Sequence, residues 1–279
     1  TGFRCSTLRV PSMSKSTTFS GTIEPNERIT YRTVHEDEHL LVVEKPTRLV
    51  TTPGVGHEHD TLLNGLMAKY RKQLTNMGNV RDHGMLHRLD KETSGLLVVA
   101  LNQKAYDGLR AQFEQREIKK YYWAVCLKAP REHEGVIRKP ISDVLKRASR
   151  YTSTRTSRID RNGKPAVTAY RVIQESALAA LIEARPITGR LHQIRVHLDS
   201  VGAAVLGDDL YGPKIIRDAS PRLALHSHRL SFTHPISGER LDIRTQFPRD
   251  LRTTVKKMNL SRPEIAPPAP IAKPISESE

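Results

Sequence analysis

An acid between two cations has the residue type and setting best suited to chemistry in this chain. Asp90 is flanked by Arg88 and Lys91, and a turn-forming Thr-Ser-Gly sequence follows it. The apolar run Leu96–Leu101 then predicts a buried strand. A carboxylate on a loop held against a rigid strand, close to positive charge, can stay ionised and act on a bound substrate. The competing interpretation is a solvated turn acid, the commoner role for a single Asp.

A cation that needs an acidic partner lies about one hundred residues further on. Apolar residues at steps of three, four and three predict an amphipathic helix that begins after Thr188-Gly189 and ends at Gly202. The stripe consists of Leu191, Ile194, Leu198 and Val201. Arg195 lies beside it and so starts from a partly buried position, for which a bidentate carboxylate is the best partner. A catalytic acid could supply that partner, and so could a purely structural one.

The run Lys120–Leu127 is aromatic and β-branched, which predicts a strand. Strand alternation places Tyr121 and Tyr122 on opposite faces, so only one of them can face a cleft. An aromatic ring in a cleft can stack on a nucleobase that has left its own stack. Core packing is the alternative, and we expect Tyr121 or Trp123 to do it.

The composition favours a polyanionic partner. The 279 residues include 45 Lys and Arg against 30 Asp and Glu, a formal net charge of +15, and nucleic acid is the first candidate for such a surface. Ten of the cations lie between Arg138 and Arg171 against two acids. This stretch predicts a face that grips an RNA backbone, with Arg147 and Arg150 as contacts, although a solvated surface is the alternative. No basic amphipathic helix with a bulky apolar face is visible, so we do not expect a membrane partner.

Together, these segments resemble the RluA-type RNA pseudouridine synthases. The first motif is His-Arg-Leu-Asp, ending at Asp90, and the second is Thr-Gly-Arg-Leu-His-Gln-Ile-Arg, ending at Arg195. A third, Lys-x-Tyr-x-Ala, selects Tyr122 over its neighbour. The resemblance covers residues 35 to 248, and three further stretches carry it. These are Asn162–Tyr170, Gly207–Gly212 and Leu225–Pro235.

The resemblance implies that Asp90 is the essential catalytic residue and that Arg195 pairs with it. It also implies that Tyr122 stacks on the target base and takes its ring proton, and that no cofactor or metal is needed. Whether Asp90 attacks the sugar or removes a ribose proton is left open. Further substrate contacts are expected from side chains in or beside the motifs: His87, Arg88, Lys91, Lys120, Arg190 and His192.

Two functions are compatible with these residues. The first is a cofactor-free enzyme that isomerises uridines in structured RNA, with ribosomal RNA favoured over tRNA. The second is an RNA-binding assembly factor of the large ribosomal subunit that uses the same fold, with or without catalysis. We expect a monomer that binds RNA, and ribosomal or assembly proteins are left open as further partners.

Some positions depart from the family pattern or suggest other chemistry. Arg48 stands where the family has Gly after Lys45-Pro46, so the loop there could run differently. We expect no S4-like RNA-binding domain before residue 30. The sequences His57-Glu-His59 and His226-Ser-His228 each place two imidazoles on one face, but they lack a third ligand at suitable spacing, so no metal is predicted.

The chain divides into a leader over residues 1–28, a catalytic domain over 29–260 and a disordered Pro-rich tail over 261–279. Residues 1–23 of the leader are rich in Ser and Thr, carry three cations and contain no acid. This is typical of a transit-peptide remnant and predicts a mitochondrial protein, although a leader without meaning, in the cytoplasm or nucleus, is the alternative. Cys5 and Cys126 form no disulfide framework, which favours a reducing compartment.

Strands and helices are mixed without a strict βαβ rhythm. We therefore predict an α+β pseudouridine synthase fold, with a largely antiparallel mixed sheet, flanking helices and a cleft across the sheet. Helices are predicted over 61–74 and 103–115, and strands over 39–44, 120–127, 167–173 and 178–184. Residues 135–171 should form short strands at best, with a hairpin turn at Asn162-Gly163.

Overall fold

The structure is a computed structural model that describes residues 22–147 and 153–263. Its strands are β1 (Arg32–Glu36), β2 (Leu40–Lys45), β3 (Ser94–Ala100), β4 (Lys119–Cys126), β5 (Glu134–Ile137), β6 (Ile141–Arg147), β7 (Ser153–Ile159), β8 (Thr168–Glu175), β9 (Ala180–Pro186), β10 (Leu225–Thr233) and β11 (Arg240–Arg244). Its helices are α1 (Leu62–Met77), α2 (Gln103–Glu114), α3 (Gln193–Asp199), α4 (Lys214–Asp218) and α5 (Arg252–Lys257), with 3₁₀ helices η1 (Asn79–Gly84) and η2 (Arg249–Leu251). Within these described ranges, no helix has the length and apolar character needed to cross a bilayer.

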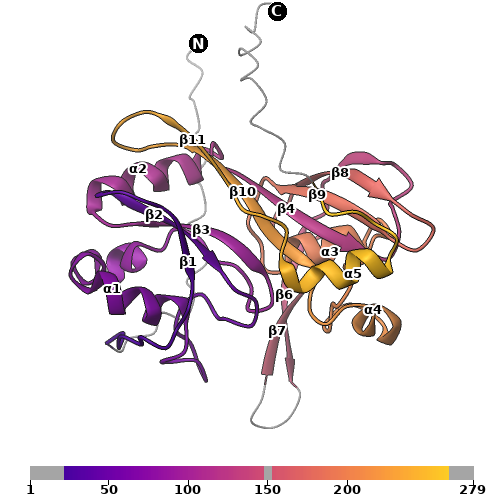
Figure 1. Ribbon diagram of the computed structural model, residues 1–279, viewed down its shortest axis with the longest axis horizontal. Coiled ribbons are helices and arrows are strands. Elements are labelled where there is room, and N and C mark those ends of the chain that lie inside the picture. Colours follow the sequence, from indigo (N-terminus) through magenta and orange to yellow (C-terminus); the bar gives the residue numbers. More distant parts are fainter. Residues whose placement is uncertain (1–21, 148–152, 264–279) are drawn as a thin grey trace, which may run out of the picture.

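A mixed sheet organises the described part of the chain (Figure 1). Nine strands follow the order β1-β2-β3-β10-β4-β9-β8-β5, with β11 paired to β10 at the side. The β3–β10 pair is parallel and the other named pairs are antiparallel. The predicted α+β class with a largely antiparallel sheet is therefore confirmed. The predicted helices and strands are present, with ends displaced by one to three residues.

The strands β2 and β3 carry apolar residues at nearly every position because both of their faces are covered. Alternate residues pack with α1 on one face: Leu41, Val43, Leu97 and Val99. The others pack with α2: Leu40, Val42, Leu96 and Val98. Both helices begin at a side-chain cap, because Thr61 accepts from the Asn64 backbone and Asn102 accepts from the Ala105 backbone. Since each fully buried apolar side chain contributes about 1.5–3 kcal/mol, β3 gives the loop before it a rigid support.

A glycine sets the close approach of β3 and β10. Gly95 has φ +118°, a value that side chains rarely allow, and a Cβ there would lie 2.2 Å from the Ser227 carbonyl oxygen. The pairing of Gly95 with Ser227 brings the end of the Asp90 loop onto a strand more than one hundred residues away. The centre of the sheet thus joins the early and late parts of the chain.

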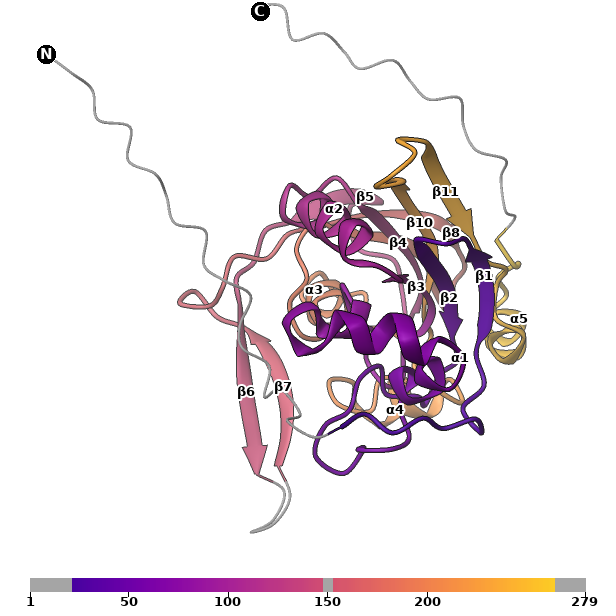
Figure 2. The same cartoon turned by 90° about the vertical axis from the view of Figure 1, so that its left-hand side faces the viewer.

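The strands β6 and β7 form a separate two-stranded arm that stands off the body (Figure 2). Seven residue pairs hold it in register, from Ile141 opposite Ile159 to Arg147 opposite Ser153. The prediction of short strands at best over 135–171 is therefore wrong. The Asn162-Gly163 turn also does not close this hairpin. It folds the chain back after β7, where Gly163 donates to the Asp160 carbonyl and Lys164 bridges to Ile141.

Candidate active site

The backbone of the Asp90 loop is held by hydrogen bonds with side chains of a neighbouring loop. The Thr51 hydroxyl donates to the Leu89 carbonyl at 2.7 Å and accepts from the Leu89 amide at 3.2 Å. The Thr47 hydroxyl donates to the Glu92 carbonyl at 2.9 Å. These contacts fix the backbone on both sides of Asp90, while its side chain remains 23% exposed. A carboxylate on a fixed backbone that still reaches solvent is suited to meet a substrate.

Lys45, at the end of β2, ties the same two loops together from inside the protein. Its side chain is fully buried, and Nζ donates to the carbonyls of Pro46 (2.9 Å), Leu49 (2.7 Å) and Lys91 (3.2 Å). Burial lowers the pKa of Lys45 to about 7, and the nearby charge of Asp90 opposes that fall. In the sequence, Lys45 was noted only as part of the Lys45-Pro46 pair that precedes Arg48. A lysine before proline, directly after an apolar strand, was the available signal.

Arg195 pairs with an acid other than the one expected. Its guanidinium makes a bidentate contact with Asp208, with Nε–Oδ2 at 2.8 Å and Nη2–Oδ1 at 2.6 Å, and both side chains are almost fully buried. A second carboxylate, Asp209, lies 3.5 Å away. Among the described residues, Arg195 has no ion pair with Asp90 within 4.0 Å, so the expected Asp90–Arg195 pair is corrected to Arg195–Asp208.

The electrostatic surroundings still connect Arg195 with Asp90. Burial would lower the pKa of Arg195, but its hydrogen bonds to Asp208 and the charges of Asp208 and Asp90 raise it. The Tyr211 ring lies against the guanidinium, 4.9 Å from Cζ to the ring centroid. Neither Asp208 nor Tyr211 was nominated from the sequence. Both lie in the Gly207–Gly212 motif, which was noted there only as part of the resemblance.

The helix that carries Arg195 starts later than the apolar steps predicted. The Gln193 side chain accepts from the Thr188 hydroxyl (2.7 Å) and from the Arg190 amide (3.0 Å), and it donates to the Val167 carbonyl (2.9 Å). These bonds hold residues 188–190 as a turn against β8. The helix α3 therefore begins at Gln193, after His192 in a left-handed conformation with φ +50°.

His192 is the imidazole that the structure places beside the acid. Its Nε2 lies 4.0 Å from Asp90 Oδ2, and 10% of its side chain is exposed. Burial lowers the pKa of His192, whereas the charge of Asp90 acts in the opposite direction. The imidazole is therefore neutral at pH 7. His192 was expected to touch substrate, and the structure places it next to the candidate catalytic carboxylate.

Tyr122 reaches the same region from β4. Burial raises the pKa of Tyr122 well above its ordinary value, a hydrogen bond with Ser227 lowers it, and the charge of Asp90 raises it further. The side chain is therefore a neutral phenol, 6% exposed. Trp123, its neighbour on the opposite face, stacks on His228 with centroids 3.9 Å apart. Strand alternation thus places Tyr122, whose pKa responds to the charge of Asp90, and Trp123, which packs on His228, on opposite faces of β4.

The remaining nominated residues fall into two groups. His87 is anchored to the fold, because its Nε2 accepts from the Val98 amide at 3.0 Å and its ring lies 5.2 Å from Phe113. Lys120 lies over the same Phe113 ring, and burial lowers its pKa to about 8. Both side chains are thus held against the fold but stay partly exposed, so their contacts with RNA stay predictions.

The second group is closer to solvent. Arg88 and Lys91 are exposed, and Lys91 Nζ lies 3.4 Å from His57 Nε2. Arg190 is partly exposed and donates to the Pro165 carbonyl. The Arg147 side chain and all of Arg150 lie outside the described residues, so those two contacts stay predictions.

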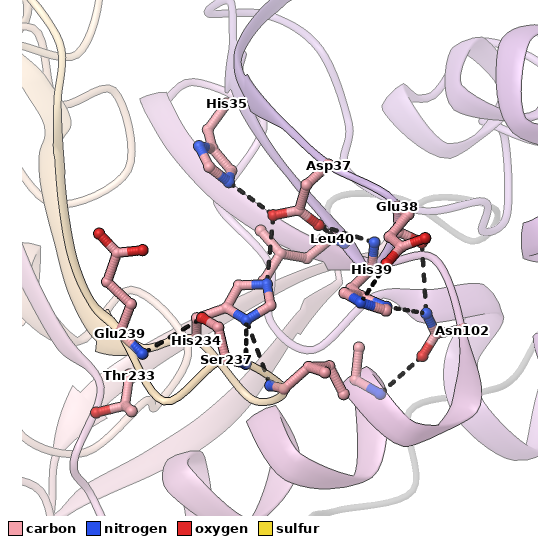
Figure 3. Close-up of polar contacts among 12 residues, drawn as sticks. His35, Asp37, Glu38, His39, Leu40, Asn102, Thr233, His234, Ser237 and Glu239 are labelled. Atoms are coloured by element: carbon pink, nitrogen blue, oxygen red, sulfur yellow. Dashed lines mark hydrogen bonds and ion pairs between the residues drawn. The ribbon is translucent and has the colours of Figure 1, made fainter.

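A histidine-rich cluster lies where β1 leads into β2 and where β10 leads into β11 (Figure 3). Asp37 Oδ2 contacts Nε2 of His35 at 2.9 Å and Nε2 of His234 at 3.3 Å. The other nitrogen of His234 accepts from the Ser237 amide, so Nε2 carries its proton. Asp37 thereby fastens the β1–β2 turn to the β10–β11 turn. Within the described ranges, no group of three His, Cys, Asp or Glu could hold a metal ion.

The site combines an acid on a loop held by hydrogen bonds with a tyrosine whose pKa responds to the charge of that acid. A basic two-stranded arm accompanies them, and such a basic surface is a feature of proteins that bind nucleic acid. The family model for RNA pseudouridylate synthase matches residues 39–200. The chain belongs to this family and is an RNA pseudouridine synthase. The motifs that end at Asp90 and Arg195 both lie within the matched range.

Relatives and solved structures agree with that assignment. A ribosomal large subunit pseudouridine synthase D from Zymomonas mobilis is 40% identical over 245 residues, which cover 85% of this chain and 75% of the relative. The dual-specificity RNA pseudouridine synthase RluA from Escherichia coli is 37% identical over 74% of this chain and 88% of the relative. The structure of human RNA Pseudouridylate Synthase Domain Containing 4 has a TM-score of 0.63 and 26% identity, and the match covers 83% and 94% of the two chains.

Proposed function

We propose that this enzyme isomerises uridines in large-subunit ribosomal RNA, with Asp90 as its catalytic carboxylate. The observation that carries the catalytic assignment is the convergence on Asp90. His192 Nε2 lies 4.0 Å from Asp90 Oδ2, and the side chains of Thr51 and Lys45 donate to the backbone carbonyls of Leu89 and Lys91 on either side of Asp90. Ribosomal RNA is favoured over tRNA because two similar relatives are named as ribosomal large subunit enzymes.

The reaction exchanges one bond for another. The bond from uracil nitrogen to ribose breaks, the ring turns, a bond from uracil carbon to the same ribose carbon forms, and the proton on that ring carbon leaves while the freed nitrogen gains one. Asp90 would act at the ribose, either as nucleophile or as base.

Tyr122 would stack on the extruded base. Flipping a base costs a few kcal/mol, and one aromatic stack returns about 1–3 kcal/mol, so stacking offsets extrusion without supplying net affinity. Because Tyr122 is a neutral phenol, it can accept the ring proton only after its own proton has moved. Ser227, which hydrogen-bonds Tyr122 and itself donates to the Leu96 carbonyl, is the adjacent group.

Affinity would come from the arm. Arg155 and Arg158 are exposed on β7, and each has one acid partner, Asp143 and Asp160. Such exposed pairs are worth about 0–1 kcal/mol, so they exchange readily for RNA phosphates. Contacts of this kind position the backbone and make binding depend on salt.

The proposal is tested by mapping pseudouridine after incubation of unmodified large-subunit ribosomal RNA or tRNA with the recombinant protein. We expect discrete pseudouridines in the ribosomal RNA with wild type and none with Asp90→Asn. Arg110→Gln is a matched control, because Arg110 lies on the exposed face of α2, where it pairs with Glu114. Sites confined to tRNA would contradict the ribosomal substrate, and full activity of Asp90→Asn would contradict the catalytic role.

A role as a large-subunit assembly factor is compatible with the same RNA contacts. It predicts that cells depleted of the protein have assembly defects while their pseudouridine map is unchanged. Rescue of assembly by Asp90→Asn would support this second function. The presence of Tyr122 beside an accessible Asp90 favours catalysis.

The mitochondrial location stays a prediction. Its support is the basic, Ser- and Thr-rich composition of residues 1–23, most of which lie outside the described residues. Import of the full chain into isolated mitochondria, compared with a chain in which Arg4, Arg9 and Lys15 are changed to Glu, tests it. Equal import of both chains would contradict the prediction.

A further inference from the structure

A chain of polar contacts runs from the arm to the Asp90 carboxylate. The Ser157 amide of β7 donates to the Tyr211 hydroxyl at 2.7 Å. The same hydroxyl lies 2.7 Å from His192 Nδ1, and His192 Nε2 lies 4.0 Å from Asp90 Oδ2. The element that we propose to hold RNA is thus two side chains away from the carboxylate that we propose to act on it.

The proton positions in this chain follow from its donors. A backbone amide can only donate, so the Tyr211 oxygen accepts from Ser157 and retains one proton to give. His192 Nδ1 is at hydrogen-bond distance to receive it. Nδ1 is then the unprotonated ring nitrogen, and the neutral imidazole carries its proton on Nε2, the nitrogen next to Asp90. Burial raises the pKa of Tyr211 and lowers that of His192, so both are neutral at pH 7.

Each member of the chain is fixed from the side. The Tyr211 amide donates to Asp208 Oδ1 at 3.0 Å, and its ring lies against the Arg195 guanidinium. His192 is the N-cap residue of α3, but its side chain makes no capping hydrogen bond and its backbone has φ +50°. A residue other than glycine keeps this conformation only where its surroundings hold it there.

From this geometry we propose that His192 is a positioning residue for Asp90, and that Tyr211 sets the imidazole tautomer and links it to the arm. The inference rests on the proposed function, because it assumes that Asp90 is catalytic. At 4.0 Å the contact between His192 and Asp90 is longer than a hydrogen bond. Catalytic contacts are often long without substrate and shorten in the complex. RNA bound along β7 would lie next to Ser157, the first member of this series of polar contacts.

Three variants separate the steps. Tyr211→Phe keeps the ring against Arg195 and removes only the hydroxyl. His192→Gln places an amide nitrogen near the position of Nε2, so it keeps a donor toward Asp90 that needs no help from Tyr211. His192→Ala removes the donor. Tyr170→Phe is the matched control, because the Tyr170 hydroxyl donates to the Glu132 carbonyl on the distant β8–β5 edge.

Single-turnover release of tritium from ribosomal RNA transcripts labelled at uracil C5 measures the step in which that proton leaves. We expect Tyr211→Phe and His192→Ala to reduce the maximal rate about 10-fold or more while the RNA concentration for half-maximal rate changes less than about 2-fold. His192→Gln should retain most of the rate, and adding Tyr211→Phe to it should cause no further loss. Nitrogen NMR of ¹⁵N-histidine protein should show the Nε2–H tautomer at His192 in wild type and a mixture in Tyr211→Phe.

A purely structural role predicts a different pattern. The losses would then follow thermal stability, and Tyr211→Phe would reduce the rate equally in wild type and in His192→Gln. That pattern, or a full rate in Tyr211→Phe with an unchanged tautomer, would overturn the inference. Inactivity of wild type on these transcripts would instead count against the proposed substrate, so the two failures are distinguishable.

Discussion

The Asp90 loop and the β6–β7 arm lie close together but are held by different kinds of contact. The loop is fixed by buried hydrogen bonds from Thr51 and Lys45 to backbone carbonyls. The arm is held mainly by its own cross-strand pairs, with the Ser157–Tyr211 bond and the Ile141–Lys164 bridge at its base. A group that does chemistry needs a fixed position, whereas a surface that follows an RNA backbone gains from freedom to adjust.

This difference predicts two classes of variant. Changes in the loop and its supports should alter the maximal rate or the free energy of unfolding and should be insensitive to salt. Changes in the arm should alter RNA affinity and its salt dependence while the rate at saturating RNA stays the same. The expectations below run from the largest effect to the smallest.

Asp90→Asn should reduce tritium release from C5-labelled RNA by at least about 10³-fold, the scale seen when a group that contacts the reacting atoms is removed. The side chain keeps its size and loses its charge, so RNA affinity and the free energy of unfolding should change little. Filter binding and urea unfolding provide those controls. A loss of RNA affinity as large as the loss of rate would assign Asp90 to the gripping surface instead.

Arg195→Met should lower the free energy of unfolding by about 3–5 kcal/mol, because it leaves the Asp208 carboxylate buried without its partner. The double variant Arg195→Met/Asp208→Asn should recover most of that loss, since the buried charge is then gone. Urea unfolding of wild type, Arg195→Met and the double variant measures both effects. The maximal rate of the double variant then shows whether Arg195 also affects catalysis by Asp90, the pairing that the family resemblance implied.

Lys45 should make stability depend on pH in a defined direction. Its pKa is about 7 in the folded protein and 10.5 when unperturbed, so between these values the unfolded chain binds more proton than the folded one. The contribution of Lys45 is therefore complete above pH 10.5 and is lost as the pH falls toward 7, by up to a few kcal/mol. The difference in unfolding free energy between wild type and Lys45→Met, measured from about pH 6 to about pH 10, should change in this sense. A difference that does not vary with pH would show that Lys45 titrates alike in both states.

Removing charge from the arm should act on binding alone. Arg155→Gln and Arg158→Gln should each weaken RNA binding several-fold and reduce the slope of log affinity against log salt by about 1. The rate at saturating RNA should equal that of wild type. Arg110→Gln on α2 is again the matched control. A reduced rate at saturation in either arm variant would mean that the arm and the loop do not divide the work in this way.

Arg48→Gly should have the smallest effect. Arg48 has φ +61°, the left-handed region in which glycine is favoured. Relief of that strain should raise the free energy of unfolding by about 0.5–1 kcal/mol without changing rate or RNA affinity. Thermal unfolding measures the gain. An equal gain from Arg48→Ala would trace the effect to the side chain rather than to the backbone.

The sequence predicted the loop far better than the arm, for physical reasons. The strands β2 and β3 are covered on both faces, so each contains a continuous apolar run that is easy to recognise in the sequence. The helix α2 that follows β3 begins at a side-chain cap, which is a further local signal. The described side chains of the arm form no apolar face. Its residues alternate between a few buried polar positions, such as Thr156 and Ser157, and exposed cations. Cross-strand pairing holds such strands, and a hydrophobic pattern does not reveal it.

The partner of Arg195 was also beyond the sequence. A motif can place an arginine near an acid but cannot choose between Asp90 and Asp208. The choice depends on the turn at Gly207, whose φ is +74° and where a Cβ would lie 2.0 Å from the Arg222 carbonyl oxygen. Gly207 thus passes close to the Arg222 backbone directly before Asp208, and Asp208 is bound to α3 by the Arg195 guanidinium. The contact of His192 with substrate stays a prediction, and its neighbour at Nδ1 is a hydroxyl 19 residues away, which no local motif reveals.

The parallel contact between β3 and β10 also bears on the order of events during synthesis. Strand β3, which supports the Asp90 loop, lies between β2 and β10. Strand β2 is close to β3 in the sequence, whereas β10 pairs its Ser227 with Gly95 of β3. Strand β4 meets β3 only through β10, because β10 lies between them in the sheet. Contacts of such long sequence separation form late and slowly. A nascent chain that has not yet released Thr233 from the ribosome therefore lacks the centre of its sheet, and the enzyme cannot begin to modify RNA until nearly the whole domain has been made.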